Sequence, residues 1–459
     1  MTYVEAVPMT YTPHTPDDVE AMLAAIGVGS VEELFADIPE SVRLRRPLEV
    51  EGPMGEAEVY RFFRSLAAQN RTVHDLVHFV GAGAYEHTIP AVVQALISRG
   101  EFLTAYTPYQ AEASQGNLQA IFEFQTMIAE LTGLDVAQAS LYDGATAAAE
   151  AMLLAARVTK RRRVLVSRAL HPDVRDVLRT YAFGPDLSVD EVPIDARTGA
   201  TDAAALAERL DKDVAAVFVQ YPNFFGVVEP LDVLFAPVRE AGALAVAVAN
   251  PLALGLLAPP GALGADVVVG DAQPLGVPLS FGGPYVGYMA AREAFVRELP
   301  GRIVGETTDG EGRRGYVLTL QAREQHIRRE RATSNITSNQ ALMALAVTIT
   351  LSLLGKRGIE DLARLNAQKA HYSLQTIEAR TPLRRVHTGP FFHEFLLDVG
   401  VPAKELLARM CERGFVAGYD VSRRYPEYPT HLLVAVTEVR TREEIERFAE
   451  ALAQAVSGS

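Results

Sequence analysis

The sequence predicts an α/β protein in which helices cover both faces of a largely parallel sheet, with a helical arm before it and a small α+β domain after it. Two observations predict this fold. In the middle of the chain, short and almost wholly apolar runs alternate with helical stretches, as expected of strands buried on both faces. Toward the C-terminus, strands with alternating polar and apolar residues take their place. With 459 residues, the chain is long enough for a large domain and a smaller companion.

Residues 1–75 are polar and helix-prone, and we expect them to form an N-terminal helical arm. Pro16-Asp17-Asp18 opens one helix, because proline suits the first turn and acidic side chains are favourable at the positive end of the helix dipole. Pro53 interrupts the chain before a second helix. Residues 1–16 have no basic start and no continuous apolar segment, so we expect no secretory signal.

Residues 76–330 are predicted to form the large domain. Its expected buried strands are residues 163–167, 214–219, 244–248 and 266–269. Helical patterns lie among them at residues 147–158, 172–181 and 203–210. Strands and helices that alternate in this way favour a parallel sheet with helices on both sides.

Residues 331–459 are predicted to form a small C-terminal α+β domain. An alternating strand at residues 394–399 precedes a helix that Pro402 opens and Gly414 closes. A second strand is expected at residues 431–439.

The last helix of the chain has a sequence signature at its start and an apolar stripe along its length. Thr441 and Glu444 have the spacing of a capping box. The stripe that we expect to be buried consists of Ile445, Phe448, Leu452 and Val456.

Composition excludes several classes of protein. The formal net charge of −14 disfavours general binding to a phosphate backbone, so no nucleic-acid partner is expected. Cys411 is the only cysteine, which excludes internal disulfides and fits a reducing, cytoplasmic compartment. The apolar stretch at residues 241–260 is interrupted by Asn250 and by prolines, and residues 340–354 are too few for a membrane span. We read the second stretch as a core helix and expect no membrane segment.

The most unusual local sequence is residues 104–117, where tyrosines, glutamines and hydroxyl side chains precede a helix that starts near Asn117. Ser114 is well placed as its N-cap. One interpretation is an ordinary polar loop with a helix cap. The other is a loop that presents hydroxyls and amides to an anionic ligand near a helix start.

Two further segments have equally open interpretations. Gly81 and Gly83, followed by His87, permit close approach of the backbone to a ligand, but an ordinary turn explains them as well. The segment at residues 142–147 begins an alanine-rich helix. Either Asp143 or Thr146 simply caps that helix, or the backbone amides of its first turn receive a phosphate.

Metal, triad and ATPase chemistry are disfavoured. His74 and His78 have i, i+4 spacing without a HExxH glutamate or a third ligand, so we expect no metal site. Neither a P-loop nor a GxSxG elbow is present. Arginines cluster at residues 313–331, interrupted by Glu324 and Glu330, which fits a solvated face or a patch for an acidic protein partner.

Together the motifs resemble a known family. FLTAYTPYQAEASQG at residues 102–116, LYDGATAAAEA at 141–151 and QYPNFFGVVEPL at 220–231 closely resemble the P-protein of the glycine cleavage system, that is, glycine decarboxylase. The resemblance continues through PPGALGADVVVGDAQPLGVPLSFGGPYVGYMA, GRRGYVLTLQAREQHIRRERATSNITSNQAL and GPFFHEF, and it covers nearly the whole chain in order. Within that family, the sequence is similar to subunit 1, the alpha subunit, of the two-subunit form.

The resemblance implies a fold and a reaction. It implies the aspartate-aminotransferase type of pyridoxal-phosphate (PLP) enzyme, fold type I, with a large domain on a mainly parallel sheet and a small C-terminal domain. It also implies a glycine dehydrogenase (decarboxylating) activity, in which glycine and the lipoyl arm of the H-protein give carbon dioxide and the aminomethyl-lipoyl H-protein. In such chemistry the protonated pyridine ring of PLP takes up the electrons released by decarboxylation.

The groups that PLP chemistry needs are not where the resemblance would place them. A Schiff-base lysine normally follows a buried strand near the end of the large domain. The segment at residues 266–287 contains none of the five lysines, which are Lys160, Lys212, Lys356, Lys369 and Lys404. The position of the usual pyridine-binding aspartate corresponds to Asn250, whose neutral amide does not stabilise a pyridinium as a carboxylate does.

The resemblance therefore implies a lysine-free half of a composite enzyme. A beta subunit would bring PLP and its lysine, and loops of this chain would reach that cofactor pocket. The expected contributors are Tyr106, Thr107, Tyr109, Gln110, Ser114 and Gln115, with His87 and, toward the cofactor of the partner, Gly81 and Gly83. Asn335 and Asn339 are weaker candidates because helix capping explains them equally well, and His171, where relatives often stack a ring on PLP, has either a retained or a vestigial role.

The expected partners are the beta subunit, the lipoylated H-protein and glycine. A heterotetramer is the expected assembly, although the sequence itself leaves one alpha-beta pair or two open. Two alternatives to the catalytic subunit remain: a structural or regulatory pseudoenzyme that only stabilises the beta subunit, and an autonomous PLP enzyme that uses an unexpected lysine.

Overall fold

A computed structural model describes residues 13–457 of the chain. The chain divides into two units, Met1–Asn70 and Arg71–Ser459. The first unit contains α1 (Pro16–Ile26), a 3₁₀ turn at Val31–Phe35 and α2 (Glu56–Ala67).

The two helices of the first unit form without a core of their own. Thr15 caps α1 by accepting a hydrogen bond from the backbone of Asp18 at 3.3 Å, while the Asp18 carboxylate accepts one from the backbone of Thr15 at 2.8 Å. Neither α1 nor α2 contains a buried residue. Apolar side chains such as Phe63, 62 % exposed, therefore lie on the surface of this unit.

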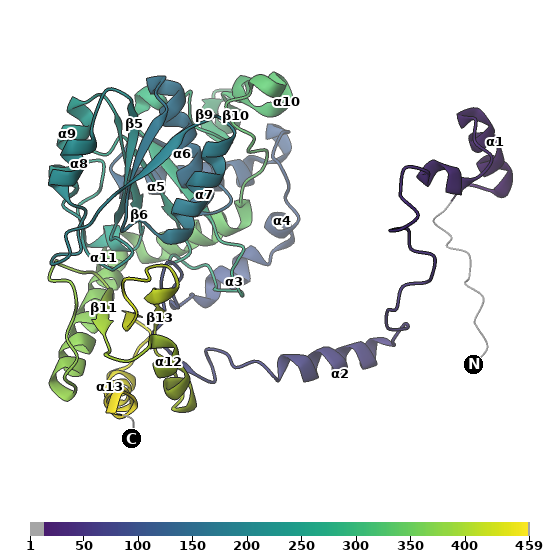
Figure 1. The fold of residues 1–459 in the computed structure, drawn as a ribbon. Helices are drawn as coiled ribbons and strands as arrows, with labels where there is room; N and C mark the ends of the chain where they lie inside the picture. Colours follow the sequence, from purple (N-terminus) through teal and green to yellow (C-terminus); the bar gives the residue numbers. More distant parts are fainter. Residues whose placement is uncertain (1–12, 458–459) are drawn as a thin grey trace. The chain divides into compact units, whose positions relative to one another are not determined.

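The second unit contains a seven-stranded sheet in the order β2-β8-β7-β6-β5-β3-β4 (Figure 1). The five strands from β7 to β4 are parallel, and β8 and β2 add an antiparallel edge. This is the predicted mainly parallel sheet. The strands are β2 (Val136–Ala137), β3 (Arg163–Ser167), β4 (Ser188–Val192), β5 (Val214–Tyr221), β6 (Leu244–Ala249), β7 (Val267–Asp271) and β8 (Gly287–Ala291).

Alternate residues of the sheet enter two separate cores, which explains why its inner strands are almost wholly apolar. In β3, Leu165 belongs to one core, while Val164 and Val166 belong to the other. Two helices cover the second face, α6 (Gly144–Thr159) and α7 (Pro172–Phe183). The first face is covered by α3 (Ala91–Ile97), α5 (Gln115–Thr132), α8 (Ala203–Arg209), α9 (Leu231–Glu240) and the first half of α11 (Ala341–Arg380).

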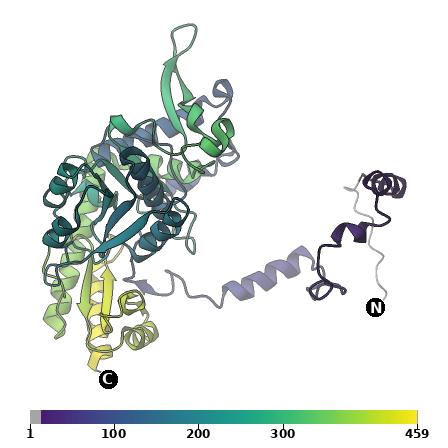
Figure 2. The same ribbon diagram turned by 45° about the horizontal axis from the view of Figure 1, so that its top comes forward.

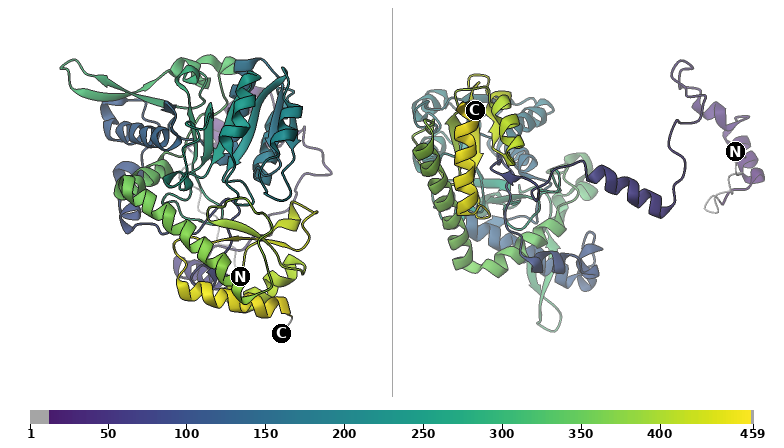
Figure 3. Two further views of the ribbon diagram at one scale, coloured as in Figure 1. Left: turned by 90° about the vertical axis from the view of Figure 1, so that its left-hand side faces the viewer. Right: turned by 90° about the horizontal axis from the view of Figure 1, so that it is seen from below.

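Helix α11 joins the large and small domains (Figure 3, left). Its length and apolar composition alone would suffice for a membrane span, but Ala344 and Val347 pack into the core of the sheet, as predicted for residues 340–354. A non-helical Gly355 interrupts it, and Ala370 and Ile377 enter the core of the small domain. Side chains of α11 thus enter the cores of both domains. The division at residue 331 and the end of the arm at residue 75 stay predictions.

The small domain pairs β11 (Glu394–Asp398) with β14 (His431–Ala435), which in turn pairs with β13 (Tyr419–Asp420). Helices α12 (Ala403–Glu412) and α13 (Arg442–Ser457) cover the sheet, and the predicted capping box of Thr441 and Glu444 is present. The predicted second strand is too long: it ends at Ala435, because Thr437 and Glu438 bind the loop at residues 86–88 instead. A short pair, β1 (Val77–His78) with β12 (Phe415–Val416), adds residues near the arm to this domain.

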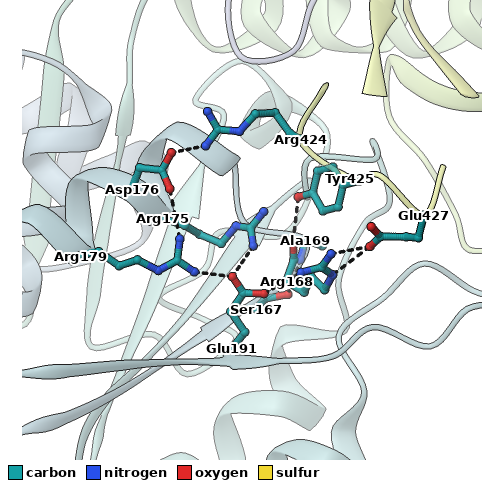
Figure 4. Close-up of polar contacts among 10 residues, drawn as sticks. All are labelled: Ser167, Arg168, Ala169, Arg175, Asp176, Arg179, Glu191, Arg424, Tyr425 and Glu427. Atoms are coloured by element: carbon teal, nitrogen blue, oxygen red, sulfur yellow. Dashed lines mark hydrogen bonds and ion pairs between the residues drawn. The ribbon is translucent and has the colours of Figure 1, made fainter. Parts of the chain in front are cut away.

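Polar contacts fix the small domain to the large one (Figure 4). The Tyr425 hydroxyl donates to the backbone carbonyl of Arg168 at 2.9 Å. The guanidinium of Arg168 pairs with Glu427, and Arg424 pairs with Asp176. The buried Arg175 lies 5.2 Å from the Tyr425 ring centroid and pairs with Glu191 at 2.5 Å. Charges on α7 and on the segment after β3 therefore hold a loop of the small domain beside the sheet.

A hairpin of β9 (Ile303–Thr308) and β10 (Arg314–Thr319) projects from the large domain (Figures 2 and 3). The arginine-rich region that follows is not one continuous helix: it contains only α10 (Gln325–Arg328) between short 3₁₀ turns. Arg323 is buried and donates to the carbonyl of Gly301 at 2.8 Å. Part of the arginine-rich segment that we expected on the surface is therefore hydrogen-bonded inside the protein.

Candidate functional site

A cavity of about 490 Å³ lies where the parallel strands end. Its walls include His171 after β3, Gln220 near the end of β5, Asn250 after β6 and Asp271 at the end of β7. In parallel α/β sheets, ligands bind outside the carboxyl ends of the strands. The cavity is therefore the candidate site of this chain.

The first turn of α6 is held by the protein's own carboxylates. Asp143 is the N-cap and accepts from the backbone of Thr146 at 2.8 Å. Asp271 accepts from the backbone of Gly144 at 3.0 Å and from the backbone of Gln273 at 2.9 Å. Of the two interpretations of this segment, the helix cap is confirmed. Two of the amides that would attract an external phosphate, those of Gly144 and Thr146, already donate to carboxylates.

Burial dominates the electrostatics of Asp271. Removal from water raises the pKa of its carboxyl to about 6, while the backbone hydrogen bonds lower it and the neighbouring charge of Asp143 raises it further. No cation among residues 13–457 offsets the burial, so the site carries negative charge at neutral pH at an energetic cost.

The His171 side chain contacts the loop at residues 81–88, called here the glycine loop because it contains Gly81 and Gly83. It does not extend unbound into the cavity. Its Nδ1 accepts from the backbone of Asp173 at 3.1 Å, and its Nε2 lies 2.8 Å from the carbonyl of Ala82. Gly83 has a left-handed φ of +104°, and a Cβ there would lie 3.0 Å from the His171 ring. Burial lowers the pKa of His171, which keeps the imidazole neutral.

A second wall of the cavity comes from the small domain and the glycine loop. Glu394 is buried and accepts from the Tyr85 hydroxyl at 2.8 Å and from the backbone of Ala82 at 2.6 Å. Burial raises its pKa to about 7. Gly81 faces the same carboxylate, since a Cβ there would lie 2.6 Å from the Oε1 atom of Glu394. Both glycines thus allow the loop to approach side chains of this chain.

His87 belongs to a buried pair and does not line the cavity. Its Nδ1 lies 2.7 Å from the Oε2 atom of Glu438, and the two side chains are 3 % and 6 % exposed. The pKa of Glu438 falls to about 2: burial raises it, but the hydrogen bond and charge of His87 and the backbone of Thr88 outweigh burial. This pair joins the glycine loop to the small domain.

The loop at residues 104–117 lies away from the cavity. Tyr106 is 87 % and Tyr109 56 % exposed, and neither Thr107, Gln110 nor Ser114 lines the cavity. Ser114 stands at the N-cap position of α5, but its side chain makes no capping hydrogen bond, contrary to the prediction. The helix itself is confirmed at Gln115–Thr132.

Gln115 anchors this loop to the projecting hairpin. Its Nε2 donates to the carbonyl of Tyr316 at 2.8 Å, and its Oε1 accepts from the backbone of Tyr316 at 2.8 Å. Its amide therefore pairs with strand β10 as a neighbouring strand would. The loop before it presents two exposed tyrosines on a fixed base.

The two asparagines of SNITSN differ. Asn339 accepts from Arg302 at 2.9 Å and donates to the hydroxyl of Ser140 at 3.0 Å. Asn335 is exposed. Gln340 occupies the N-cap position of α11. Helix capping thus explains neither residue, and Asn339 instead bridges the segment before α11 to the loop after β2.

Sequence reasoning located Asn250, His171 and Gly83 of the cavity but missed Tyr85, His393 and the carboxylates Asp271 and Glu394 as parts of one site. Asp271 and Glu394 are 123 positions apart in the sequence, and only the packing of the small domain on the sheet brings them to the same cavity. The available signal was a charged residue at the end of one apolar strand and at the start of another.

Comparison with known proteins places the chain. The family model of the glycine cleavage system P-protein matches residues 9–452. The chain belongs to this family. It is 55 % identical to a probable glycine dehydrogenase (decarboxylating) subunit 1 of Geobacillus kaustophilus, with 96 % of this chain and 98 % of the relative aligned. A protein of the same name from Desulfitobacterium hafniense is 52 % identical over 96 % of this chain and 98 % of its own.

Solved structures agree with the fold. The crystal structure of a glycine decarboxylase (P-protein) in inhibitor-bound form has a TM-score of 0.85 and 46 % identity, covering 97 % of this chain and 100 % of its own. The glutamate decarboxylase of Lactobacillus brevis has a TM-score of 0.68 at 12 % identity, covering 92 % and 97 % of the two chains. That likeness concerns the fold alone. The predicted fold of PLP-dependent type I enzymes is confirmed.

The cavity of this chain does not fit PLP. All five lysines lie within the described residues, and none lines the cavity. After β7 the chain continues as Ala272 and Gln273. The side-chain amide of Gln273 accepts a hydrogen bond from the backbone N–H of Tyr85 and donates one to its carbonyl. Asp271 occupies the helix amide that a phosphate would need. No cluster of three or more metal-binding side chains occurs in residues 13–457.

Proposed function

We propose that this protein is the first subunit of a cytoplasmic two-subunit glycine dehydrogenase (decarboxylating). In this assembly a second subunit binds PLP through its own lysine, glycine loses its carboxylate there, and the aminomethyl group passes to the lipoyl arm of the H-protein. One observation carries the proposal: a member of the P-protein family retains the cavity of the fold, but neither a lysine nor a free phosphate site lies in it.

The contribution of this chain is then made at a surface. Tyr106, Thr107, Tyr109 and Gln110 form a loop whose tyrosines are largely exposed, and Gln115 fixes the base of that loop. We propose that this loop, with Ser114, completes the cofactor pocket of the second subunit. Aromatic and hydroxyl side chains on a fixed loop suit orientation of a substrate.

For Gly81, Gly83 and His87 we propose a positioning role. Their close contacts lie with Glu394, His171 and Glu438 of this same chain. They therefore shape the loop at residues 81–88, and the proposed reach of Gly81 and Gly83 toward the partner's PLP would follow from the shape of that loop rather than from free side chains.

The test of this proposal is co-expression with the second subunit. We expect a complex that elutes as a heterotetramer, catalyses exchange between glycine and bicarbonate, and loses this activity when either chain is omitted. Borohydride reduction followed by peptide mapping should place the pyridoxyl group on a lysine of the second subunit. Pyridoxyl on one of the five lysines of this chain, with exchange activity from this chain alone, would refute the proposal.

A further inference from the structure

The charged side chains that line the cavity are all acidic. They are Asp143, Asp173, Asp271 and Glu394, and the described lining contains neither lysine nor arginine. A cavity with one sign of charge attracts ligands of the opposite sign. An acidic cluster alone does not make a site, so the partners of each carboxylate decide which of them have binding capacity left.

Two of the four carboxylates are already engaged. Asp173 pairs with Arg424 at 3.0 Å, and its side chain is 70 % exposed. Asp143 caps α6. Asp271 and Glu394 differ, since Glu394 is buried and Asp271 half-buried in the cavity wall, and both accept hydrogen bonds only from neutral donors among the described residues. Each carboxylate oxygen has two lone pairs, so each keeps acceptor capacity.

His393 points independently to a ligand. It is 3 % exposed and lines the same cavity, yet neither of its ring nitrogens has a hydrogen-bond partner in the described part of the chain. Burial and the nearby His87 lower its pKa to about 3, so the ring is neutral and offers one donor and one acceptor. Buried polar groups are almost always paired, which means that this ring lacks the partner that a ligand would supply.

The remaining side chains that line the cavity indicate the chemical character of that ligand. Tyr85, Tyr142 and Tyr285 contribute aromatic rings, and much of the rest is alanine, valine and proline. Aromatic faces attract cations, and an apolar lining favours a hydrocarbon tail. An anion is disfavoured because the carboxylates of Asp143 and Asp271 stand at the start of α6 and accept from its Thr146 and Gly144 amides. A metal ion is disfavoured because residues 13–457 offer no set of three metal-binding side chains.

We propose that this cavity binds a small organic ammonium ion, with Asp271 and Glu394 as its counter-charges and His393 as a hydrogen-bond partner. The inference goes beyond the proposed function, because it gives the first subunit a ligand of its own. No covalent step is involved: the ammonium group donates hydrogen bonds, and its hydrocarbon tail lies among the apolar and aromatic side chains.

The titration of the two carboxyls supports this assignment. Burial raises the pKa of both groups in the absence of a cation. The titratable neighbours are Tyr85 for Glu394 and Asp143, Tyr285 and Tyr288 for Asp271, and the neutral imidazoles of His171 and His393 line the same cavity. None of these is positively charged at neutral pH. A bound ammonium would favour the ionised carboxylates.

Calorimetric titration of the purified full-length chain tests the proposal. Three probes have the same hydrocarbon tail: butylammonium chloride, butan-1-ol and sodium butyrate. We expect one site for butylammonium with an affinity at least about tenfold above that of butan-1-ol, and no binding of butyrate or inorganic phosphate. Because the readout is binding to this chain, its failure leaves the proposed decarboxylase function untouched.

Variants locate the site. Glu394→Gln and Asp271→Asn should each weaken butylammonium binding by about tenfold, since each removes one charge that faces the cation. Asp173→Asn is the matched control, because Arg424 already neutralises this carboxylate, and it should leave the affinity unchanged. Ala145→Leu would narrow the cavity without altering a carboxylate and should also weaken binding.

Several results would overturn the proposal. They are equal binding of butan-1-ol, preferred binding of butyrate or phosphate, and an equal effect of Asp173→Asn and Glu394→Gln. Should Asp271→Asn fail to fold, the Glu394→Gln and Ala145→Leu titrations decide the matter, because neither change removes a hydrogen bond of the α6 N-terminus.

Discussion

The cavity at the strand ends and the loop at residues 104–117 differ in how their polar groups find partners. Around the cavity, Asp271 and Glu394 bind backbone amides and a tyrosine of the same chain. In the loop, Gln115 hydrogen-bonds to β10 and the half-exposed Tyr109 ring lies 5.8 Å from the ring of His326, while Tyr106 is 87 % exposed. The polar groups of the cavity wall are satisfied largely by partners in this chain, whereas much of the loop is exposed to solvent.

This difference shows how a cofactor fold can change its role. A parallel sheet creates a cavity at its strand ends whatever residues line it, since the fold alone sets that position. Here carboxylates and a glutamine fill the places that cofactor chemistry would use. Under the proposed function, the contribution of this chain is made instead at a surface that a partner would cover. Variants in the two regions should therefore affect different properties: stability for the cavity and its supports, and turnover for the loop.

The largest expected effect concerns the buried pair beside the cavity. Replacement of Glu438 by alanine leaves His87 and Asn366 without their carboxylate partner. We expect the free energy of unfolding to fall by about 3–5 kcal/mol, as for other broken buried pairs. Urea unfolding at pH 7 measures it.

The pH dependence of that loss has a defined sign. The folded pKa of Glu438, about 2, lies below its usual 4.5, so its stabilising contribution is present above pH 4.5 and is lost as the pH falls toward 2. The gap between wild type and Glu438→Ala should narrow in acid. Glu360→Ala removes an exposed pair with Arg364 and should change stability by no more than about 0.5 kcal/mol; equal losses in both variants would contradict the assignment.

Glu394 should show the opposite pH dependence. Its folded pKa of about 7 lies above the usual 4.5, so the folded state binds the proton more tightly and stability falls as the pH rises from 4.5 through 7. Ionisation of this one buried group would lower the free energy of unfolding by up to about 3 kcal/mol at pH 8. Glu394→Gln should remove that slope while keeping bonds to Ala82 and Tyr85, as measured by urea unfolding at pH 5, 6.5 and 8. An unchanged slope would show that Glu394 is not the titrating group.

Much of the fold was predictable because it rests on local patterns. The strand at Arg163–Ser167 and the helix after Pro172 follow from short apolar runs and helix-start signals, and the structure has both. The end of the strand that starts at His431 was not predictable, because Thr437 and Glu438 leave the sheet to bind residues 86–88, more than 300 positions away.

The candidate site was predictable only in part, for the same physical reason. A missing lysine and a neutral Asn250 are visible in the sequence, since they lie beside strands that the sequence itself locates. Asp271, Glu394 and His393 line the same cavity only because the small domain packs against the large one. No local pattern of residues indicates that packing.

The loop provides the next largest effect, and it concerns turnover. Tyr106→Ala in the assembled complex should lower glycine–bicarbonate exchange by roughly tenfold to a hundredfold if this ring orients the substrate. The melting temperature of this chain should stay the same, since the ring is 87 % exposed and buries little apolar surface here.

An exposed ring elsewhere is the control for Tyr106. Phe183, at the end of α7, is 90 % exposed, and Phe183→Ala should change neither turnover nor stability. Undiminished exchange in Tyr106→Ala, within a complex of normal size, would favour the alternative in which this chain only stabilises its partner.

The smallest effects distinguish two residues of one motif. Asn339 bridges Arg302 and Ser140, so Asn339→Ala should lower the free energy of unfolding by about 1–3 kcal/mol, because it leaves a buried guanidinium short of an acceptor. Asn335 is exposed, and Asn335→Ala should stay within about 0.5 kcal/mol of wild type. Parallel urea titrations compare the two. If Asn335→Ala instead lowered exchange without a change in stability, the surface that we propose for contact with the partner would extend from the tyrosine loop to the segment before α11.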